Sequence, residues 1–139
     1  KELRPDSGGA GTYRGGLGQF MEVGAQEGHE FDIQAMFDRV NYPARGRRGG
    51  QEGAPTLIGQ DDGTKMRGKG KQFVPHGRRV MMAFPGGAGY GSAALRDPVL
   101  VRRDLALGYI SKETAQKHYG LSSDLIDRVL EVAKKGDIF

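Results

Sequence analysis

Three glycine-dense stretches contain the residues of this sequence whose types and spacing could support chemistry. They cover residues 4–18, 43–53 and 85–91. Glycine lets the backbone adopt positive φ angles and approach a ligand or another chain segment closely. Successive backbone N–H groups in such a stretch can form a concave nest that binds an anion. The sequence therefore indicates either anion-binding loops or close packing between chain segments in these places.

Other residue types give little support to thiol, metal or nucleotide chemistry. The chain has no cysteine, which excludes disulfides, thiolate metal sites and a cysteine nucleophile. His29, His76 and His118 are far apart and share no metal-ligand spacing. Residues 87–91 lack the full spacing of a dinucleotide-binding loop, and no P-loop lysine motif occurs. We therefore expect these residues to bind neither a metal ion nor ATP.

Basic residues are concentrated in two places. Six of them, and no acid, lie between Lys65 and Arg79, and a second cluster contains Arg45, Arg47 and Arg48. Such clusters can bind phosphate or nucleic acid. On a strand edge, lysine and arginine instead prevent pairing with another sheet. Phe73 is the one aromatic residue within the first cluster, too few to form a platform for base stacking, which favours the second interpretation.

Residues 1–92 hold most of the glycine and are predicted to form short strands joined by turns. Alternating apolar and polar residues predict three of the strands, at residues 21–25, 31–37 and 79–84. Between the first two, residues 26–29 are predicted to form a hairpin loop. The Asp-Gly step within residues 61–63 predicts a tight turn. Successive strands with short loops predict an antiparallel sheet.

Residues 93–139 are predicted to be a helical segment. Asp97 followed by Pro98 is typical of a helix start, and Ser111 can cap a second helix that Gly120 ends. A third helix is predicted from Ser122 or Ser123, because apolar residues recur at helical spacing up to residue 133. The predicted fold class is α+β, with an antiparallel β-rich region followed by a small C-terminal helical segment. Both regions are expected to form one structural unit within a larger subunit.

The motifs occur in a distinctive order along the chain: RPDSGGAGTYRGGLG, then PGGAGYG, then RDP, then LALGYISKETAQKHYG. In order and spacing they resemble the C-terminal part of the hydantoinase B/oxoprolinase family. One small departure is Ala88, which interrupts the last glycine run. The chain also opens with Lys1 rather than methionine, in the middle of a motif. We therefore expect it to be a piece of a longer subunit of this family.

The resemblance implies a subunit of an ATP-dependent cyclic-amide hydrolase of the hydantoin or 5-oxoproline type. In this chemistry ATP, bound by a hydantoinase A-type partner subunit, phosphorylates a carbonyl oxygen, and hydrolysis of the ring amide follows. The alternative is a subunit of an ATP-dependent ketone carboxylase, in which activated bicarbonate is captured. The implied partners are the rest of its own subunit, the ATP-binding subunit and a small-molecule substrate, in a hetero-oligomer. A divalent metal would be bound upstream of this piece, which is expected to be inactive alone.

Within this framework the candidates for substrate contact are Asp6, Ser7, Gly8, Gly9 and Arg14. Asp6 could orient water or accept a proton, and Arg14 could hold a phosphate or carboxylate in a forked contact. Ser7 and the amides after it could bind an oxyanion. In the alternative, Asp6 caps a turn, Arg14 pairs with it, and the stretch has a non-catalytic role in assembly. No catalytic residue can be assigned.

A helix-turn-helix is the main alternative from another functional class. Residues 111–130 contain a short helix, a turn at Gly120 and a second amphipathic helix. However, Gln116 occupies the position where that motif needs a small residue, and Asp124 would face phosphates with the wrong sign. We therefore expect no nucleic-acid partner. No apolar run approaches the roughly 20 residues of a membrane span, so we expect no membrane partner and a cytoplasmic location.

Overall fold

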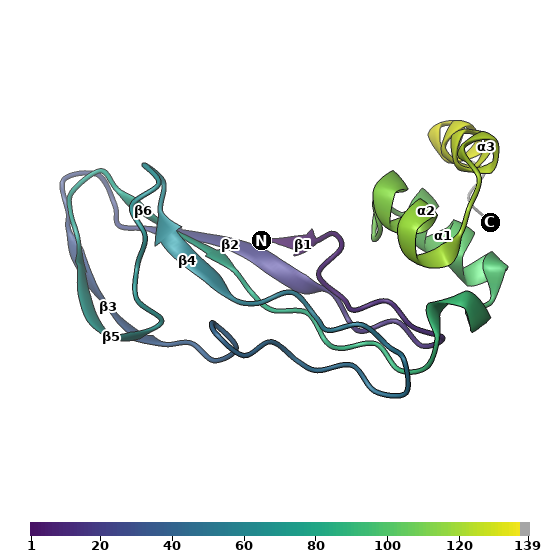
Figure 1. Cartoon of the computed structure of the whole chain (residues 1–139). Helices are drawn as coiled ribbons and strands as arrows, with labels where there is room; N and C mark the ends of the chain where they lie inside the picture. Colours follow the sequence, from purple (N-terminus) through teal and green to yellow (C-terminus); the bar gives the residue numbers. More distant parts are fainter. Residues whose placement is uncertain (137–139) are drawn as a thin grey trace.

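The computed structural model describes residues 1–136 and has an α+β architecture, with the strands at one end and the helices at the other (Figure 1). The strands come first: β1 Glu2–Arg4, β2 Gly18–Gly24, β3 Phe31–Met36, β4 Leu57–Gln60, β5 Lys69–Val74 and β6 Arg79–Ala83. The helices follow: the short 3-10 helix η1 Ala93–Leu95, then α1 Pro98–Ala106, α2 Lys112–Tyr119 and α3 Ser123–Lys134. This order confirms the predicted fold class. Residues 137–139 of the predicted helical segment lie outside the described residues, and the division into 1–92 and 93–139 stays a prediction.

The strands form a long antiparallel ribbon that bends in the middle. β2 pairs with β6 and β3 pairs with β5, so residues 18–36 lie against residues 69–83. β1 and β4 extend the first part into a sheet of order β1-β2-β6-β4. The ribbon bends where Gly28 N donates a hydrogen bond of 2.8 Å to His76 Nε2, across the two connecting loops.

The prediction of a hairpin at residues 26–29 is therefore wrong. A local turn does exist there, closed by a hydrogen bond of 3.1 Å from His29 N to Gln26 O. The strands on its two sides nevertheless pair with distant strands, because those partners complete the apolar faces of both sheets. By contrast, the tight turn at residues 61–63 is confirmed: Gly63 has a φ of 87° and Gln60 N donates to Thr64 O over 2.8 Å.

Two separate apolar clusters support the two ends of the molecule. The sheet cluster is built on buried Val74, Val80 and Met82, with half-buried side chains from both sheets around it. The helix cluster is built on five buried residues: Val101, Leu105, Ile110, Ala115 and Ile126. Because each cluster draws on one end only, the segments between them must hold the two ends together.

The predicted helix signals are confirmed at the helix ends. The Asp97 carboxylate accepts a hydrogen bond of 2.8 Å from Val99 N, and the Ser111 hydroxyl accepts one of 3.1 Å from Thr114 N. Gly120 ends α2 in the left-handed conformation, with a φ of 69°. Ser122 precedes α3 as its N-cap residue. None of the helices within residues 1–136 has the length and apolar character needed to cross a lipid bilayer.

The region between the sheet and the helices consists of extended segments rather than strands. Residues 7–17, 44–54 and 85–91 run side by side there, and we call them the glycine bundle (Figure 1). Backbone hydrogen bonds connect the segments, for example from Gly9 N to Gly87 O over 2.9 Å and from Ala54 N to Ser7 O over 2.8 Å. The segments are so close that a Cβ atom on Gly9 would lie 2.1 Å from the carbonyl oxygen of Gln51. Only glycine permits this spacing.

Candidate functional site

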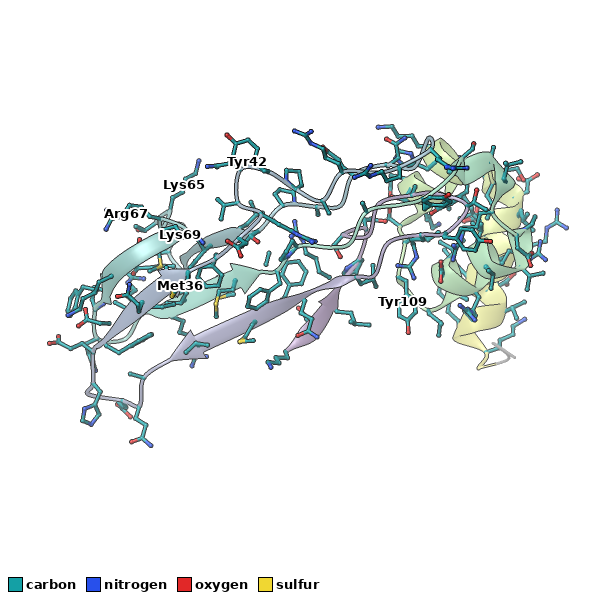
Figure 2. All side chains as sticks on the ribbon, turned by 90° about the horizontal axis from the view of Figure 1, so that it is seen from below. Met36, Tyr42, Lys65, Arg67, Lys69 and Tyr109 are labelled. Carbon is teal, nitrogen blue, oxygen red and sulfur yellow. The ribbon has the colours of Figure 1, made fainter. Side chains whose placement is uncertain are left out.

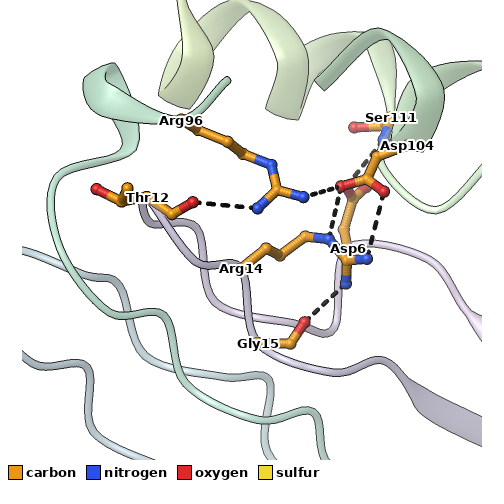
Figure 3. A network of polar contacts seen from close by, with 7 residues as sticks. All are labelled: Asp6, Thr12, Arg14, Gly15, Arg96, Asp104 and Ser111. Carbon is orange, nitrogen blue, oxygen red and sulfur yellow. Dashed lines mark hydrogen bonds and ion pairs between the residues drawn. The ribbon is translucent and has the colours of Figure 1, made fainter. Parts of the chain in front are cut away.

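A buried network of charged side chains lies where the glycine bundle meets the helices. Asp104 of α1 is 1% exposed, and its carboxylate binds two arginines (Figure 3). Arg14 Nε donates to Asp104 Oδ2 over 2.9 Å, and Arg96 donates to the same oxygen through a terminal nitrogen over 2.7 Å. The side chains of Arg14 and Arg96 are 13% and 7% exposed. We call these three residues the Arg–Asp–Arg network.

Both arginines also bind backbone carbonyls of the first glycine stretch. Arg14 donates to Gly15 O over 2.7 Å, and Arg96 donates to Thr12 O over 3.3 Å. Because these donors are already used within the chain, Arg14 has little capacity for a forked contact with a phosphate or carboxylate. The alternative interpretation, in which Arg14 pairs with Asp6, is wrong in its partner. Arg14 pairs with Asp104 instead, and the two residues are separated by 90 positions in the chain.

Asp6 lies on the surface beside this network and contacts the helical region (Figure 3). It has a positive φ of 58°, a conformation that aspartate tolerates better than most residues. Its amide donates to Tyr109 O over 3.1 Å, and its carboxylate accepts a hydrogen bond of 2.9 Å from Ser111 N. Asp6 is therefore a contact between the first glycine stretch and the start of α2, with part of its carboxylate facing solvent.

Ser7, Gly8 and Gly9 lie inside the glycine bundle. The hydroxyl of Ser7 is fully buried; it donates to Arg4 O over 2.6 Å and accepts from Gly18 N over 2.7 Å. A Cβ atom on Gly8 would lie 2.1 Å from Gly15 O. The amide of Gly9 already donates to another segment of the bundle. The structure thus brings the five candidates into one region. All of them except Asp6 are enclosed by other segments of the same chain, which leaves little room for a substrate.

Two buried polar atoms, one within the Arg–Asp–Arg network and one near it, have no hydrogen-bond partner in the described part of the chain. They are Nε of Arg96 and the hydroxyl of Tyr119 at the end of α2. Burial raises the pKa of the Tyr119 hydroxyl above its ordinary value, against the smaller opposite effect of the nearby Arg96. The backbone of Gly11 faces this hydroxyl without a hydrogen bond of normal geometry. The Tyr119 hydroxyl and the Arg–Asp–Arg network therefore lie together in a buried polar region between α1, α2 and the first glycine stretch.

Sequence reasoning missed Asp104 and Arg96 as members of this site. A signal was present, since Asp104 shares a helical stripe with Val101 and Leu105, which are both buried. An acid on the buried face of a helix needs a cationic partner. The pattern could therefore have predicted a buried ion pair, although not which arginines supply it.

The basic cluster between Lys65 and Arg79 is largely paired with acids. Lys69 and Lys71, on β5, lie 2.8 Å from Asp38 and 2.9 Å from Asp32. The hydrogen bond from Lys69 holds the pKa of Asp38 below its ordinary value. Figure 2 shows Lys65, Arg67 and Lys69 at the strand end of the molecule, whereas Tyr109 lies near the helices. Because β5 has β3 as its partner in a sheet of two strands, this arrangement favours the strand-edge interpretation.

The helical end gives no support to DNA contact. The exposed face of α3, which would be the recognition helix, carries Asp124, Asp127 and Glu131. These acids would repel phosphates. Within residues 1–136, no group of three or more histidine, aspartate or glutamate side chains is placed to hold a metal ion. A groove of about 1020 Å³ lies along the four-stranded sheet, and none of the five candidate residues lines it.

Residues 1–93 match the family described as Hydantoinase B/oxoprolinase, which is more than half of the chain. The chain belongs to this family. The match covers all three glycine stretches and both ends of the ribbon, so the glycine bundle lies within the part of this hydantoinase B/oxoprolinase chain that matches the family. The family assignment is thereby confirmed, and the match includes the motifs RPDSGGAGTYRGGLG and PGGAGYG.

Two sequence relatives and two solved structures place the chain within longer proteins. A protein from Pseudomonas sp. (strain NS671), provisionally named as the B-type subunit of a D-/L-hydantoinase, is 31% identical over 127 residues, covering 87% of this chain and 21% of that protein. The beta subunit of caprolactamase from Pseudomonas jessenii is 28% identical over 130 residues, covering 88% and 22%. The hydantoinase B/oxoprolinase chain thus spans about a fifth of the length of these curated relatives.

The solved structures differ in how close they are. The ATP-dependent caprolactamase from Pseudomonas jessenii matches 99% of this chain, with a TM-score of 0.72 and 25% identity, over 25% of its own chain. The nucleotide-free acetone carboxylase matches 97% of this chain, with a TM-score of 0.59 and 15% identity, over 24% of its own chain. The second likeness shows the shared fold alone.

Proposed function

We propose that this chain is part of a subunit of an ATP-dependent hydrolase that opens cyclic amides. The observation that carries the proposal is the likeness to the ATP-dependent caprolactamase over 99% of the chain. The relative named as a B-type hydantoinase subunit supports the same class of substrate, because hydantoins also contain a ring amide. The proposed substrate is therefore a small cyclic amide of the hydantoin, lactam or 5-oxoproline type.

A ketone carboxylase subunit is the second candidate, and the fold shared with acetone carboxylase is compatible with it. Both activities need a carbonyl oxygen to be activated with ATP, and they differ in the nucleophile that follows. In the hydrolase, water attacks the activated ring amide. In the carboxylase, an enol or enolate attacks activated bicarbonate. The closer similarity to caprolactamase makes hydrolysis the preferred proposal.

We propose that ATP is bound by a separate hydantoinase A-type subunit, so the enzyme is a hetero-oligomer. Two relatives are named as one subunit of an enzyme, a B-type subunit and a beta subunit, which supports an assembly of several chains. The described residues do not fit a metal site, so any divalent ion would be held by other parts of the subunit. The need for ATP is the reason to expect the enzyme in the cytoplasm.

Within the subunit, we propose that this region is mainly a framework. The contacts of Ser7, Gly8, Gly9 and Arg14 are internal, which supports the assembly alternative over substrate binding. Substrate contact by these residues and Asp6 stays a prediction. Asp6 is the candidate most able to meet a substrate, because its carboxylate is exposed.

The proposed reaction is tested with the complete subunit and its ATP-binding partner. ADP release would be measured with caprolactam, 5-oxoproline, N-methylhydantoin and simple ketones, each with and without bicarbonate. We expect a cyclic amide to stimulate ADP release without bicarbonate and a ring-opened product to form in equal amount. Bicarbonate-dependent turnover of a ketone would instead establish the carboxylase. Absence of any stimulated ADP release by the assembled enzyme would refute both activities.

The role of Asp6 is tested with Asp6→Asn in the same complete enzyme. Asparagine keeps the acceptor for Ser111 N and tolerates the positive φ, so assembly and melting temperature are expected to stay unchanged. If Asp6 is part of the framework only, kcat should remain within about twofold of wild type. A fall in kcat of about 100-fold or more, with assembly intact, would establish proton transfer or water orientation by this carboxylate.

A further inference from the structure

The three glycine stretches each place side chains on one common surface. Tyr13 comes from the first stretch, Arg47 and Arg48 from the second, and Tyr90 from the third. Isolated bridges pair Tyr13 with Tyr90 and Arg47 with Tyr90, so the three segments lie next to one another at this point. The two tyrosine rings are 6.3 Å apart, and the guanidinium carbon of Arg48 lies 5.9 Å from the ring centre of Tyr90. We call these four residues the Tyr–Arg surface.

Among the residues that the structure describes, the Tyr–Arg surface is exposed and its positive charge is not compensated by an acid. Tyr13 is 70% exposed and Tyr90 is 45% exposed. Arg47 and Arg48 are both exposed, and neither forms an ion pair with another described residue. By contrast, Arg78 and Arg79 of the other basic cluster are both paired with acids. Arg47 and Arg48 therefore remain available to pair with acids of another protein.

The backbone beneath these side chains is held in place before any partner binds. Tyr13 and Tyr90 exchange two backbone hydrogen bonds, of 3.0 and 2.9 Å, and Arg47 N donates to Gly89 O over 3.1 Å. A surface fixed in this way loses little entropy on binding. Tyrosine and arginine are also the residue types that most often dominate binding energy at protein interfaces. Rigid support and composition together point to a protein partner.

We propose that the Tyr–Arg surface docks an acidic surface of the ATP-binding partner subunit, an inference that rests on the proposed function. Carboxylates of the partner would pair with Arg47 and Arg48, and an apolar group would cover the rings of Tyr13 and Tyr90. Contacts between separately folded subunits accept such charged groups more readily than the interior of one fold, where each unpaired guanidinium is costly. The surface is therefore assigned to a contact with another subunit rather than with the rest of the same one.

The test uses the complete enzyme and the charge reversal Arg47→Glu with Arg48→Glu. We expect the dissociation constant between the two subunits to rise at least about tenfold, since like charges would then face each other. Lys134→Glu with Lys135→Glu is the matched control, because it makes the same charge change at exposed residues of the helical end. The control is expected to bind as wild type does. Added salt should weaken the wild-type complex more than the reversed variant.

A second variant keeps the proposal testable if the charge-reversal variant does not fold. Arg47→Gln with Arg48→Asn removes both charges, and asparagine suits the positive φ of 49° at Arg48. Weaker assembly with an unchanged melting temperature would support the interface. Equal affinities and equal salt dependence for wild type, neutral variant and control would overturn it. If the wild-type complex assembles through this surface but no cyclic amide stimulates ADP release, the proposed function fails while the interface stands.

Discussion

Replacing Asp104 by alanine is expected to lower the free energy of unfolding by about 3–5 kcal/mol. The substitution leaves Arg14 and Arg96 largely buried without the carboxylate that both of them bind. The two positive charges would then have no negative partner, in a buried region where water cannot easily take the place of the carboxylate. Chemical denaturation of the wild-type and variant chains, followed by circular dichroism, measures the difference.

Asp127→Ala is the matched control for this prediction. Asp127 also forms an ion pair, at 2.8 Å from Lys112, but the pair lies on the surface. Its loss is expected to lower the free energy of unfolding by less than about 1 kcal/mol, because solvent screens exposed charges. If both substitutions had the same small effect, the Arg–Asp–Arg network would not hold the two ends of the molecule together. Replacing all three network residues by apolar ones of similar volume should recover most of the loss from Asp104→Ala.

The adjacent glycines Gly15 and Gly16 are expected to respond in opposite ways to substitution by alanine. A Cβ atom on Gly15 would lie 2.1 Å from Gly87 O, an overlap with backbone that the bundle can relieve only by separating its segments. Gly15→Ala should therefore lower the free energy of unfolding by about 3 kcal/mol or more. A Cβ atom on Gly16 would have nothing within 4 Å. Neither glycine has a positive φ, so Gly16→Ala should be neutral or stabilise by about 0.4–1 kcal/mol, through the unfolded chain.

Thermal unfolding of the two variants beside wild type checks this contrast. The two substitutions add the same methyl group at neighbouring positions, so differences in helix propensity or hydrophobicity cancel. Equal melting temperatures for Gly15→Ala and Gly16→Ala would show that the segments of the bundle are not in direct contact. The expected separation would instead support the proposal that the glycine stretches are packing devices, and it needs no assay of activity.

Asp104→Ala and Gly15→Ala both act where the two ends of the molecule are joined. The sheet cluster and the helix cluster share no buried residue. The Arg–Asp–Arg network and the backbone hydrogen bonds of the bundle span the space between them. A change there should alter the position of the helices relative to the sheet, and with it the alignment of any contacts that this region makes within the larger enzyme.

Local features of the fold could be predicted from the sequence because they depend on residues a few positions apart. The alternation over residues 31–37 determined the β3 strand, and Asp97, Ser111 and Gly120 determined the helix ends through contacts with near neighbours. The Asp-Gly step determined the turn before Thr64 in the same way. The order of the glycine motifs was also enough to indicate the family, because several independent motifs recur at fixed spacing.

Partners that are distant in the sequence were decided only by the tertiary structure. The loop at residues 26–29 suits a hairpin, yet β2 pairs with β6 because that pairing completes an apolar face. Arg14 could bind a substrate, Asp6 or another acid, and its choice of Asp104 depends on where α1 packs. Glycine allows both ligand approach and chain packing, so its sequence pattern could not distinguish them. The distances between the segments identified chain packing as the role of these glycines. Such non-local contacts cannot be read from the sequence, because their free energy depends on all the residues packed around them.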